Sequence, residues 1–88
     1  MGQNKIQKIA FQSEHVFLYS DGWNNANGCQ KTTAVVLAKN DPNFDKAYSL
    51  VLAAFMAGKD ISGYSDGCIT WDTYTYNTIR GHKYLTVY

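Results

Sequence analysis

The sequence holds few of the residues and motifs that mark the common enzyme classes. It contains a single glutamate, Glu14, a single proline, and two histidines, His15 and His82. Neither histidine lies at a spacing from a cysteine, serine or aspartate that is typical of nucleophilic catalysis or of a zinc site. A glycine-rich phosphate-binding loop is also missing. We therefore expect a protein that is not an enzyme and that needs no metal or cofactor.

Long apolar runs and clusters of one charge are absent as well. No stretch reaches the roughly 20 apolar residues of a membrane-spanning helix, so we expect no membrane span. Eight basic and seven acidic residues give a net charge of +1, and the basic residues are scattered along the chain. Because no basic stripe is present to follow a phosphate backbone, nucleic acid is not an expected partner.

The chain is instead rich in apolar and aromatic residues for its size. Its 88 residues predict one domain, 1–88, and a hydrophobic share of 45% is enough for a globular core. Aromatic residues make up 15% of the chain, and most of them are tyrosines. Tyrosine suits β-strands, and it also suits binding surfaces because it joins a flat apolar ring to a polar tip.

The two cysteines, Cys29 and Cys68, each stand at the expected end of a strand beside a turn of similar composition. We expect a disulfide between them, which would close a loop of about 40 residues and stabilise the fold by ~3–4 kcal/mol. Two buried free thiols in a cytosolic protein are the alternative. The polar start, MGQNKIQ, contains no signal peptide, and it fits either a cytoplasmic protein or a mature chain without its leader. With a disulfide we expect a secreted or periplasmic protein.

The apolar pattern predicts the order β-β-β-α-β-β, with room for one further strand. Residues 4–20 read as a hairpin, and 30–39 have the β-branched content of a third strand. Strands also fit 59–66, part of 68–80, and 82–88, with a turn at 80–82. This order predicts a small α+β domain with a mostly antiparallel sheet or an OB-like barrel with one central helix.

A helix over 42–57 is the clearest element of the pattern. Asp41 suits the N-cap, Pro42 the first helical position and Gly58 the C-terminal end. One apolar stripe of this helix would face the sheet, and it contains Phe44, Tyr48, Val51, Leu52 and Phe55.

The opposite side of this helix is also largely apolar, and one sheet in a domain of this size covers only one side. We therefore expect a homo-oligomer that buries the other side against a second subunit. The interface would contain Leu50, Ala53, Met56 and Ala57.

The tetrapeptide Tyr-Ser-Asp-Gly occurs twice, starting at Tyr19 and at Tyr64. No other residues align between the two halves without gaps, so we interpret the copies as similar turns rather than as a duplication. Each copy is followed by a tryptophan among polar residues, a combination that suits sugar rings, which lie on flat aromatic side chains and offer hydroxyls to amides and carboxylates. Burial of each tryptophan at the end of a barrel is the alternative. The predicted ligand-binding residues are Trp23, Asn24, Asn25, Asn27, Trp71, Asp72, Tyr74 and Tyr76.

The segment AYSLVLAAFMAGKDISGYSDGC, residues 47–68, resembles the cell-binding B subunits of subtilase-type and typhoid-type bacterial toxins. Small secreted bacterial proteins are similar too, and they have a cysteine after the strand, as Cys68 is here. The resemblance implies an OB-type barrel, a ring of five subunits with the helices around a central pore, an enzymatic A subunit as a partner, and binding of sialylated glycans. The serine segment with which the toxin subunits contact sugar has no counterpart here, so the resemblance assigns no glycan-binding residue.

These observations predict a secreted, oligomeric module that binds a glycan or a cell-surface receptor. The main alternative is a structural or protein-interaction protein, such as an accessory subunit or an inhibitor, without sugar binding. An OB-type nucleic-acid binder in the cytosol is the least favoured reading, because the chain has no basic stripe.

Overall fold

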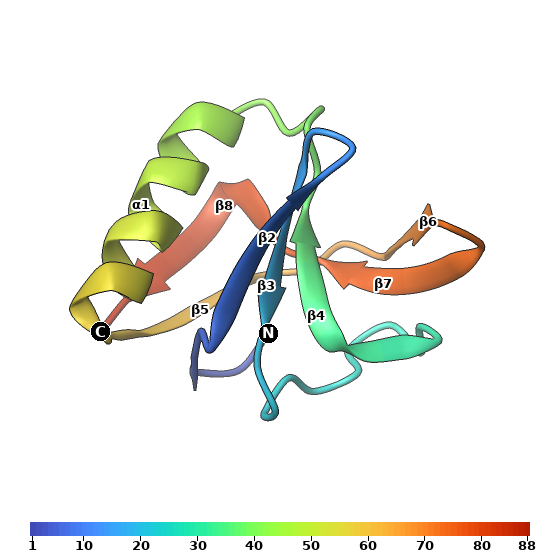
Figure 1. Cartoon of the computed structure of the whole chain (residues 1–88), viewed down its shortest axis with the longest axis horizontal. Helices are drawn as coiled ribbons and strands as arrows, with labels where there is room; N and C mark the ends of the chain where they lie inside the picture. Colours follow the sequence, from blue (N-terminus) through green and yellow to red (C-terminus); the bar gives the residue numbers. More distant parts are fainter.

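The computed structural model describes all residues from 1 to 88 and contains one helix and two β-sheets (Figure 1). The predicted α+β class with mostly antiparallel strands is therefore confirmed. The elements follow the order β1 (Asn4–Lys5), β2 (Lys8–Gln12), β3 (His15–Tyr19), β4 (Lys31–Leu37), α1 (Phe44–Ala57), β5 (Asp60–Tyr64), β6 (Cys68–Trp71), β7 (Tyr74–Thr78) and β8 (Arg80–Val87).

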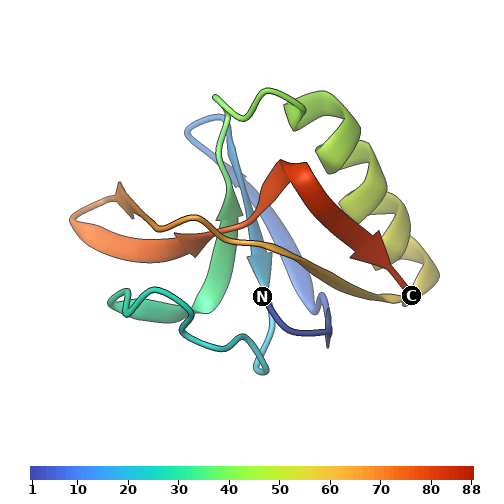
Figure 2. The ribbon, with the colours of Figure 1, turned by 180° about the vertical axis from the view of Figure 1, so that it is seen from behind.

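The strands form two sheets through local hairpins and through pairs that are far apart in sequence. One sheet has the order β2-β3-β4-β7-β6 and the other has the order β1-β5-β8. Every pair is antiparallel except β4 with β7, which is parallel. Both views show α1 alongside β8 at one end of the molecule, and the β6–β7 hairpin projecting from the other end (Figures 1 and 2).

Tight two-residue turns close both hairpins of the larger sheet. Ser13 and Glu14 connect β2 to β3, and Asp72 and Thr73 connect β6 to β7, all with positive φ between 49° and 70°. Positive φ at both central positions is the geometry whose twist matches that of paired strands. The predicted hairpin is therefore present over residues 8–19, whereas Asn4–Lys5 form a separate strand that pairs with β5 in the other sheet.

The main core lies between α1 and the inner faces of the two sheets. It is built mostly from β-branched and leucine side chains of β3, β4 and β5, together with small residues of the helix. Its fully or nearly fully buried members are Ile6, Val16, Leu18, Trp23, Val35, Leu37, Ala47, Val51, Ala54, Ile61 and Ile79.

The helix differs from the prediction at its start. It begins at Phe44 rather than at residue 42, and Asn43 occupies the N-cap without a side-chain hydrogen bond to the first turn of the helix. Asp41 lies further upstream, where its carboxylate accepts the backbone N–H of Asn43 at 2.9 Å and that of Gly81 at 3.1 Å. Asp41 therefore joins the loop before the helix to β8 instead of capping the helix. The predicted end is correct, because Gly58 has a φ of 69° and its N–H caps the last turn.

The inward side of the helix agrees only in part with the predicted stripe. Val51 is buried and Phe44 and Tyr48 pack against the core as predicted, whereas Phe55 is 36% exposed and the small residues Ala47 and Ala54 are buried instead. The reason is the short distance between the helix and β8. A side chain at Gly81 would bring its Cβ to 2.6 Å from the Cβ of Ala47, so only small residues fit along this line.

The predicted turn at Arg80–His82 is wrong. These residues begin β8, and only Ile79 separates β8 from β7. The chain thus passes directly from the larger sheet into the smaller one. Along β8, Leu85 and Val87 are partly buried while Tyr84 and Thr86 are exposed, as expected for a strand with one side toward the core.

Candidate functional site

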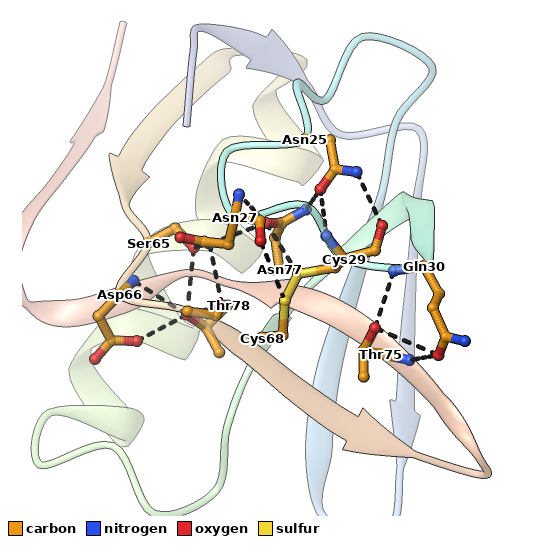
Figure 3. The surroundings of a disulfide bond; sticks show 11 residues. Asn25, Asn27, Cys29, Gln30, Ser65, Asp66, Cys68, Thr75, Asn77 and Thr78 are labelled. Carbon is orange, nitrogen blue, oxygen red and sulfur yellow. Dashed lines mark hydrogen bonds between the residues drawn. A yellow bond between two sulfur atoms is a disulfide. The ribbon is translucent and has the colours of Figure 1, made fainter.

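The predicted disulfide between Cys29 and Cys68 is present, with the two Cα atoms 5.8 Å apart. Cys29 precedes β4, and Cys68 is the first residue of β6. The bond therefore connects the loop 20–30 to the base of the β6–β7 hairpin (Figure 3). Disulfides form and persist in oxidising compartments such as the bacterial periplasm and the extracellular space.

The asparagines of the first predicted binding loop are engaged within the protein. The side-chain oxygen of Asn25 accepts the N–H of Cys29 at 2.7 Å and the side-chain amide of Asn77 at 3.0 Å. The amide of Asn27 donates to Asn77 at 2.9 Å and to Ser65 at 2.8 Å, as Figure 3 shows. Asn24 accepts the backbone N–H of Gly2 at 3.0 Å. These amides hold the loop in place, so the prediction that they contact a ligand is not supported by their geometry.

Trp23 was predicted to offer an open aromatic surface, and this expectation is wrong. The residue is 5% exposed and belongs to the main core. Its indole N–H donates a 2.9 Å hydrogen bond to the backbone carbonyl of Leu18. Burial of a tryptophan whose N–H has a partner is favourable, and no ring face remains for a ligand.

The residues after the second turn lie together on the other side of the larger sheet. Trp71 is directly opposite Tyr74, and Ile69 is directly opposite Tyr76. Directly opposed residues and alternate residues of a strand point to the same face, so these four side chains share one surface of the hairpin. The predicted ligand-binding residues Trp71, Tyr74 and Tyr76 are thus adjacent, with Asp72 in the turn at the tip of the hairpin.

This surface continues across β3, where Phe17 is its centre. The Phe17 ring is fully buried, with its centroid 5.1 Å from that of Trp71 and 5.3 Å from that of Tyr76, both edge-on. Tyr19 lies at 6.4 Å in a stacked orientation. We call this surface the aromatic face, and it contains Lys8, Phe17, Tyr19, Lys31, Ile69, Trp71, Tyr74 and Tyr76.

The outer groups of the aromatic face are polar or charged. Tyr74 is 45% exposed, and Trp71, Tyr76 and Tyr19 are partly exposed. The ammonium of Lys8 lies 4.3 Å from the centre of the Tyr19 ring, and that of Lys31 lies 4.3 Å from the centre of the Tyr74 ring. Neither lysine takes part in any of the ion pairs of the structure. Both cations therefore remain available to an incoming group.

The Tyr76 hydroxyl lies in a setting that disfavours its ionised form. Burial raises the pKa of Tyr76 above its usual range, and the nearby Tyr19, Asp72 and Tyr74 raise it further. Tyr76 therefore stays a neutral hydrogen-bond donor and acceptor at ordinary pH. On the neighbouring ring, the amide of Gln12 donates to the Tyr19 hydroxyl at 3.3 Å.

Sequence reasoning missed the part of the aromatic face that comes from β2, β3 and β4. Phe17 and Tyr19 stand two residues apart, so the alternation in β3 places both on one side. The long-range pairing of β4 with β7 brings them to Trp71 and Tyr76, and nothing in the local pattern reveals that pairing.

The predicted interface residues of α1 lie on its open side. Leu50 is 39% exposed and Met56 is 79% exposed, and both Ala53 and Ala57 are exposed. A hollow on this side is lined by Asp45, Lys46, Ser49, Leu50 and Ala53. An apolar strip with charged residues at one end thus remains uncovered in the single chain.

The two histidines lie apart from the aromatic face. His15 accepts the backbone N–H of Lys39 at 3.0 Å, and burial followed by the charge of Lys39 lowers the pKa of His15. His82 lies 3.8 Å from the carboxylate of Asp41. The structure contains no group of three or more side chains of the types that hold a metal ion. Its single helix is too short to span a membrane.

Comparison with known proteins returned no family model, no curated protein and no solved structure that matches this chain. The resemblance of residues 47–68 to toxin B subunits therefore stays a prediction.

Proposed function

We propose that this protein is a secreted, non-enzymatic module that binds carbohydrate on the aromatic face. The observation that supports this most is the position of Trp71, Tyr74 and Tyr76 beside Tyr19 on one open side of the larger sheet. These rings come from three strands, and Phe17 packs beneath Tyr19, Trp71 and Tyr76.

The chemistry of the aromatic face matches that of a sugar ring. The C–H groups on one side of a pyranose lie well on Trp71 and Tyr74, which are partly or largely exposed. The hydroxyls of Tyr19 and Tyr76, the carboxylate of Asp72 and the two lysine ammonium groups surround these rings as hydrogen-bond partners. A few polar groups around an apolar floor are typical of small-molecule sites.

The strand pairings support an OB-type barrel as the scaffold of this face. Strands β2, β3 and β4 form a meander, β4 pairs in parallel with β7, and β1 pairs with β5. The helix lies between β4 and β5 in the chain. In OB-folds the ligand surface covers the central strands between two hairpin loops. The turns at Ser13–Glu14 and Asp72–Thr73 correspond to those loops in this chain.

We further propose that the molecule acts as a homo-oligomer, through the side of α1 that contains Leu50, Ala53, Met56 and Ala57. Residues of this kind on an exposed helix are typical of surfaces that another subunit covers. A ring of such subunits would present several aromatic faces at once and raise the avidity for a surface that displays many glycans. An enzymatic subunit carried by the ring is the partner that the resemblance implies.

A protein-interaction function without sugar binding is the second candidate. The exposed Met56, at 79%, and its apolar neighbours on α1 favour it, because methionine-rich surfaces adapt to protein partners. In that case the helix would be the binding element and the aromatic face would contribute only to stability.

An array of defined oligosaccharides tests the proposal with three single variants. Tyr74→Ala and Trp71→Ala remove rings of the aromatic face and should each weaken binding by about 5- to 150-fold, the loss expected for an anchor residue worth ~1–3 kcal/mol. Tyr84→Ala is the matched control, because Tyr84 is 51% exposed but lies on the other sheet. Equal binding by all three variants, or no binding by the parent protein, would contradict the proposal.

A further inference from the structure

We propose that the Cys29–Cys68 disulfide is a redox-sensitive tie on the aromatic face. Reduction of this bond would release the β6–β7 hairpin from the loop 20–30 and separate Trp71 and Tyr76 from Phe17. The inference rests on the proposed function, because carbohydrate binding is the property that the tie would control. Carbohydrate binding at the aromatic face would then be regulated by thiol compounds outside the cell.

Near the aromatic face, noncovalent contacts hold the hairpin against the rest of the domain. Strand β6 lies at the edge of its sheet and pairs only with β7. The pairing of β7 with β4 is interrupted between Lys31 and Val35, so Lys31 with Tyr76 is the one paired position on the side of the aromatic face. Three hydrogen bonds between Gln30 and Thr75, at 2.9, 3.0 and 3.4 Å, and the packing of Trp71 and Tyr76 on Phe17 add to it.

The disulfide joins the two segments at this interruption. Cys29 stands two positions before Lys31, and Cys68 lies directly opposite Asn77 of β7. The remaining contacts around the bond are neutral hydrogen bonds of asparagine, serine and threonine side chains, as Figure 3 shows. Such bonds contribute little net free energy each. Beside the packing of Trp71 and Tyr76 on Phe17, the disulfide is the one covalent restraint on the hairpin.

The main core does not depend on the hairpin. Its members come from β3, β4, α1 and β5, with Ile6, Trp23 and Ile79 between these elements, and none comes from residues 68–76. Loss of the disulfide therefore affects the hairpin first, while the core that joins α1 to the sheets stays closed. Local opening of one supersecondary unit below the free energy of global unfolding is common in small domains.

One sulfur of the bond lies in an exposed residue. Cys68 is exposed whereas Cys29 is 5% exposed, so the thiolate of an external dithiol attacks the sulfur of Cys68. Its attack breaks the bond to Cys29, which leaves as a thiolate and takes a proton from water. The second thiol of the same dithiol then attacks the mixed disulfide and releases Cys68. The protein gains two electrons and two protons, and the dithiol becomes a cyclic disulfide.

Hydrogen exchange of backbone amides measures release of the hairpin without any ligand. The oxidised protein and the protein reduced with dithiothreitol would be compared at neutral pH. We expect amides in 68–78 to exchange at least about tenfold faster after reduction, while those in 16–18 and 34–37 keep their protection. The double variant Cys29→Ser/Cys68→Ser should match the reduced protein without any reductant, and dithiothreitol should not change it further.

Two results would overturn the inference. Unchanged exchange in the hairpin would mean that the noncovalent contacts suffice, and loss of protection throughout the chain would mean that the bond stabilises the whole domain rather than the hairpin. In parallel, binding of the reduced protein to the oligosaccharide array should fall by at least about tenfold, since a disordered site must be reordered by its ligand. If the oxidised protein also binds nothing on the array, the proposed function fails, while the exchange result still decides whether the disulfide controls the hairpin.

Discussion

At the scale of single residues, burial decides which aromatic side chains are able to bind a ligand. Trp23 and Trp71 both follow a Tyr-Ser-Asp-Gly turn and both have polar neighbours in the sequence. Trp23 nevertheless points into the main core, while Trp71 stays partly exposed beside Phe17. The two tryptophans differ because their chain segments occupy different places in the fold. Trp23 belongs to the loop 20–30, whose Asn25 and Asn27 are hydrogen-bonded to Asn77 of β7. Trp71 lies in the edge strand β6.

We therefore predict that Trp23→Ala lowers the free energy of unfolding by ~3–5 kcal/mol, the range for a large aromatic residue removed from a core. Trp23→Phe keeps much of the ring but removes the hydrogen bond to Leu18, so the loss should be about 1–3 kcal/mol. Urea unfolding of the oxidised proteins at pH 7 measures both values. An unfolding free energy of Trp23→Ala within about 1 kcal/mol of the parent would contradict the buried position of this ring.

At the scale of elements, an ionic contact joins the segment between β5 and β6 to the start of β8. The guanidinium of Arg80 donates to both oxygens of Asp66 at 3.0 and 3.1 Å. Burial alone would raise the pKa of Asp66, but hydrogen bonds from Arg80 and Thr78 and the charge of Arg80 outweigh it and lower that pKa below its ordinary value of 3.8. The contact therefore stabilises the folded chain only while the carboxylate is ionised.

The sign of the pH dependence follows from the lowered pKa. Stability from Asp66 is fully present above a pH of about 4, where the unfolded chain also carries the charge, and it disappears as the pH falls through the lower folded value. We predict that Asp66→Asn is less stable than the parent at pH 7 and that the difference shrinks toward pH 2. Urea unfolding across this range tests it.

Asp21→Asn is the matched control for this series, because Asp21 accepts only from the neutral Gln7 and from no cation. Its difference from the parent should change less with pH than that of Asp66→Asn. A difference for Asp66→Asn that stays constant from pH 7 to pH 2 would show that the charge of Asp66 does not matter.

The elements were largely predictable from local pattern, and the contacts between them were not. Gly58 predicts the end of α1, and the apolar stripe of α1 predicts the inward position of Val51. The stripe does not predict the burial of Ala47. The helix approaches the backbone of Gly81 so closely that Ala47, rather than a large residue, has to face it.

At the scale of the whole molecule, two surfaces at opposite ends of the domain are suited to different partners. The aromatic face lies on the larger sheet, and the exposed side of α1 lies beside the smaller one, as Figures 1 and 2 show for the two elements. Of the eight residues of the aromatic face, the sequence predicted three, namely Trp71, Tyr74 and Tyr76. It did not predict that Trp23 is buried or that Asn25 is hydrogen-bonded to Asn77, which lies 52 residues away in the sequence.

We predict that the chain is an oligomer at micromolar concentration and that Ala53→Glu converts it to a monomer of unchanged fold. Ala53 lies at the middle of the exposed strip, where a buried carboxylate without a partner would oppose association. Analytical ultracentrifugation gives the mass, and circular dichroism verifies the fold. Lys59→Glu, just beyond α1, is the control that should leave the mass unchanged. A monomeric parent protein would show that the strip is simply exposed.

The central claim is that the aromatic face binds carbohydrate, and mapping of the ligand by NMR tests it most directly. The oxidised, 15N-labelled protein would be titrated with the oligosaccharide that gives the strongest signal on the array. The account predicts that the largest shift changes occur at the backbone amides of Phe17, Tyr19, Lys31 and residues 69–76, with little change in α1 or in β5 and β8. Shift changes centred on α1, on the Tyr84 side of the smaller sheet, or nowhere in the chain would contradict it.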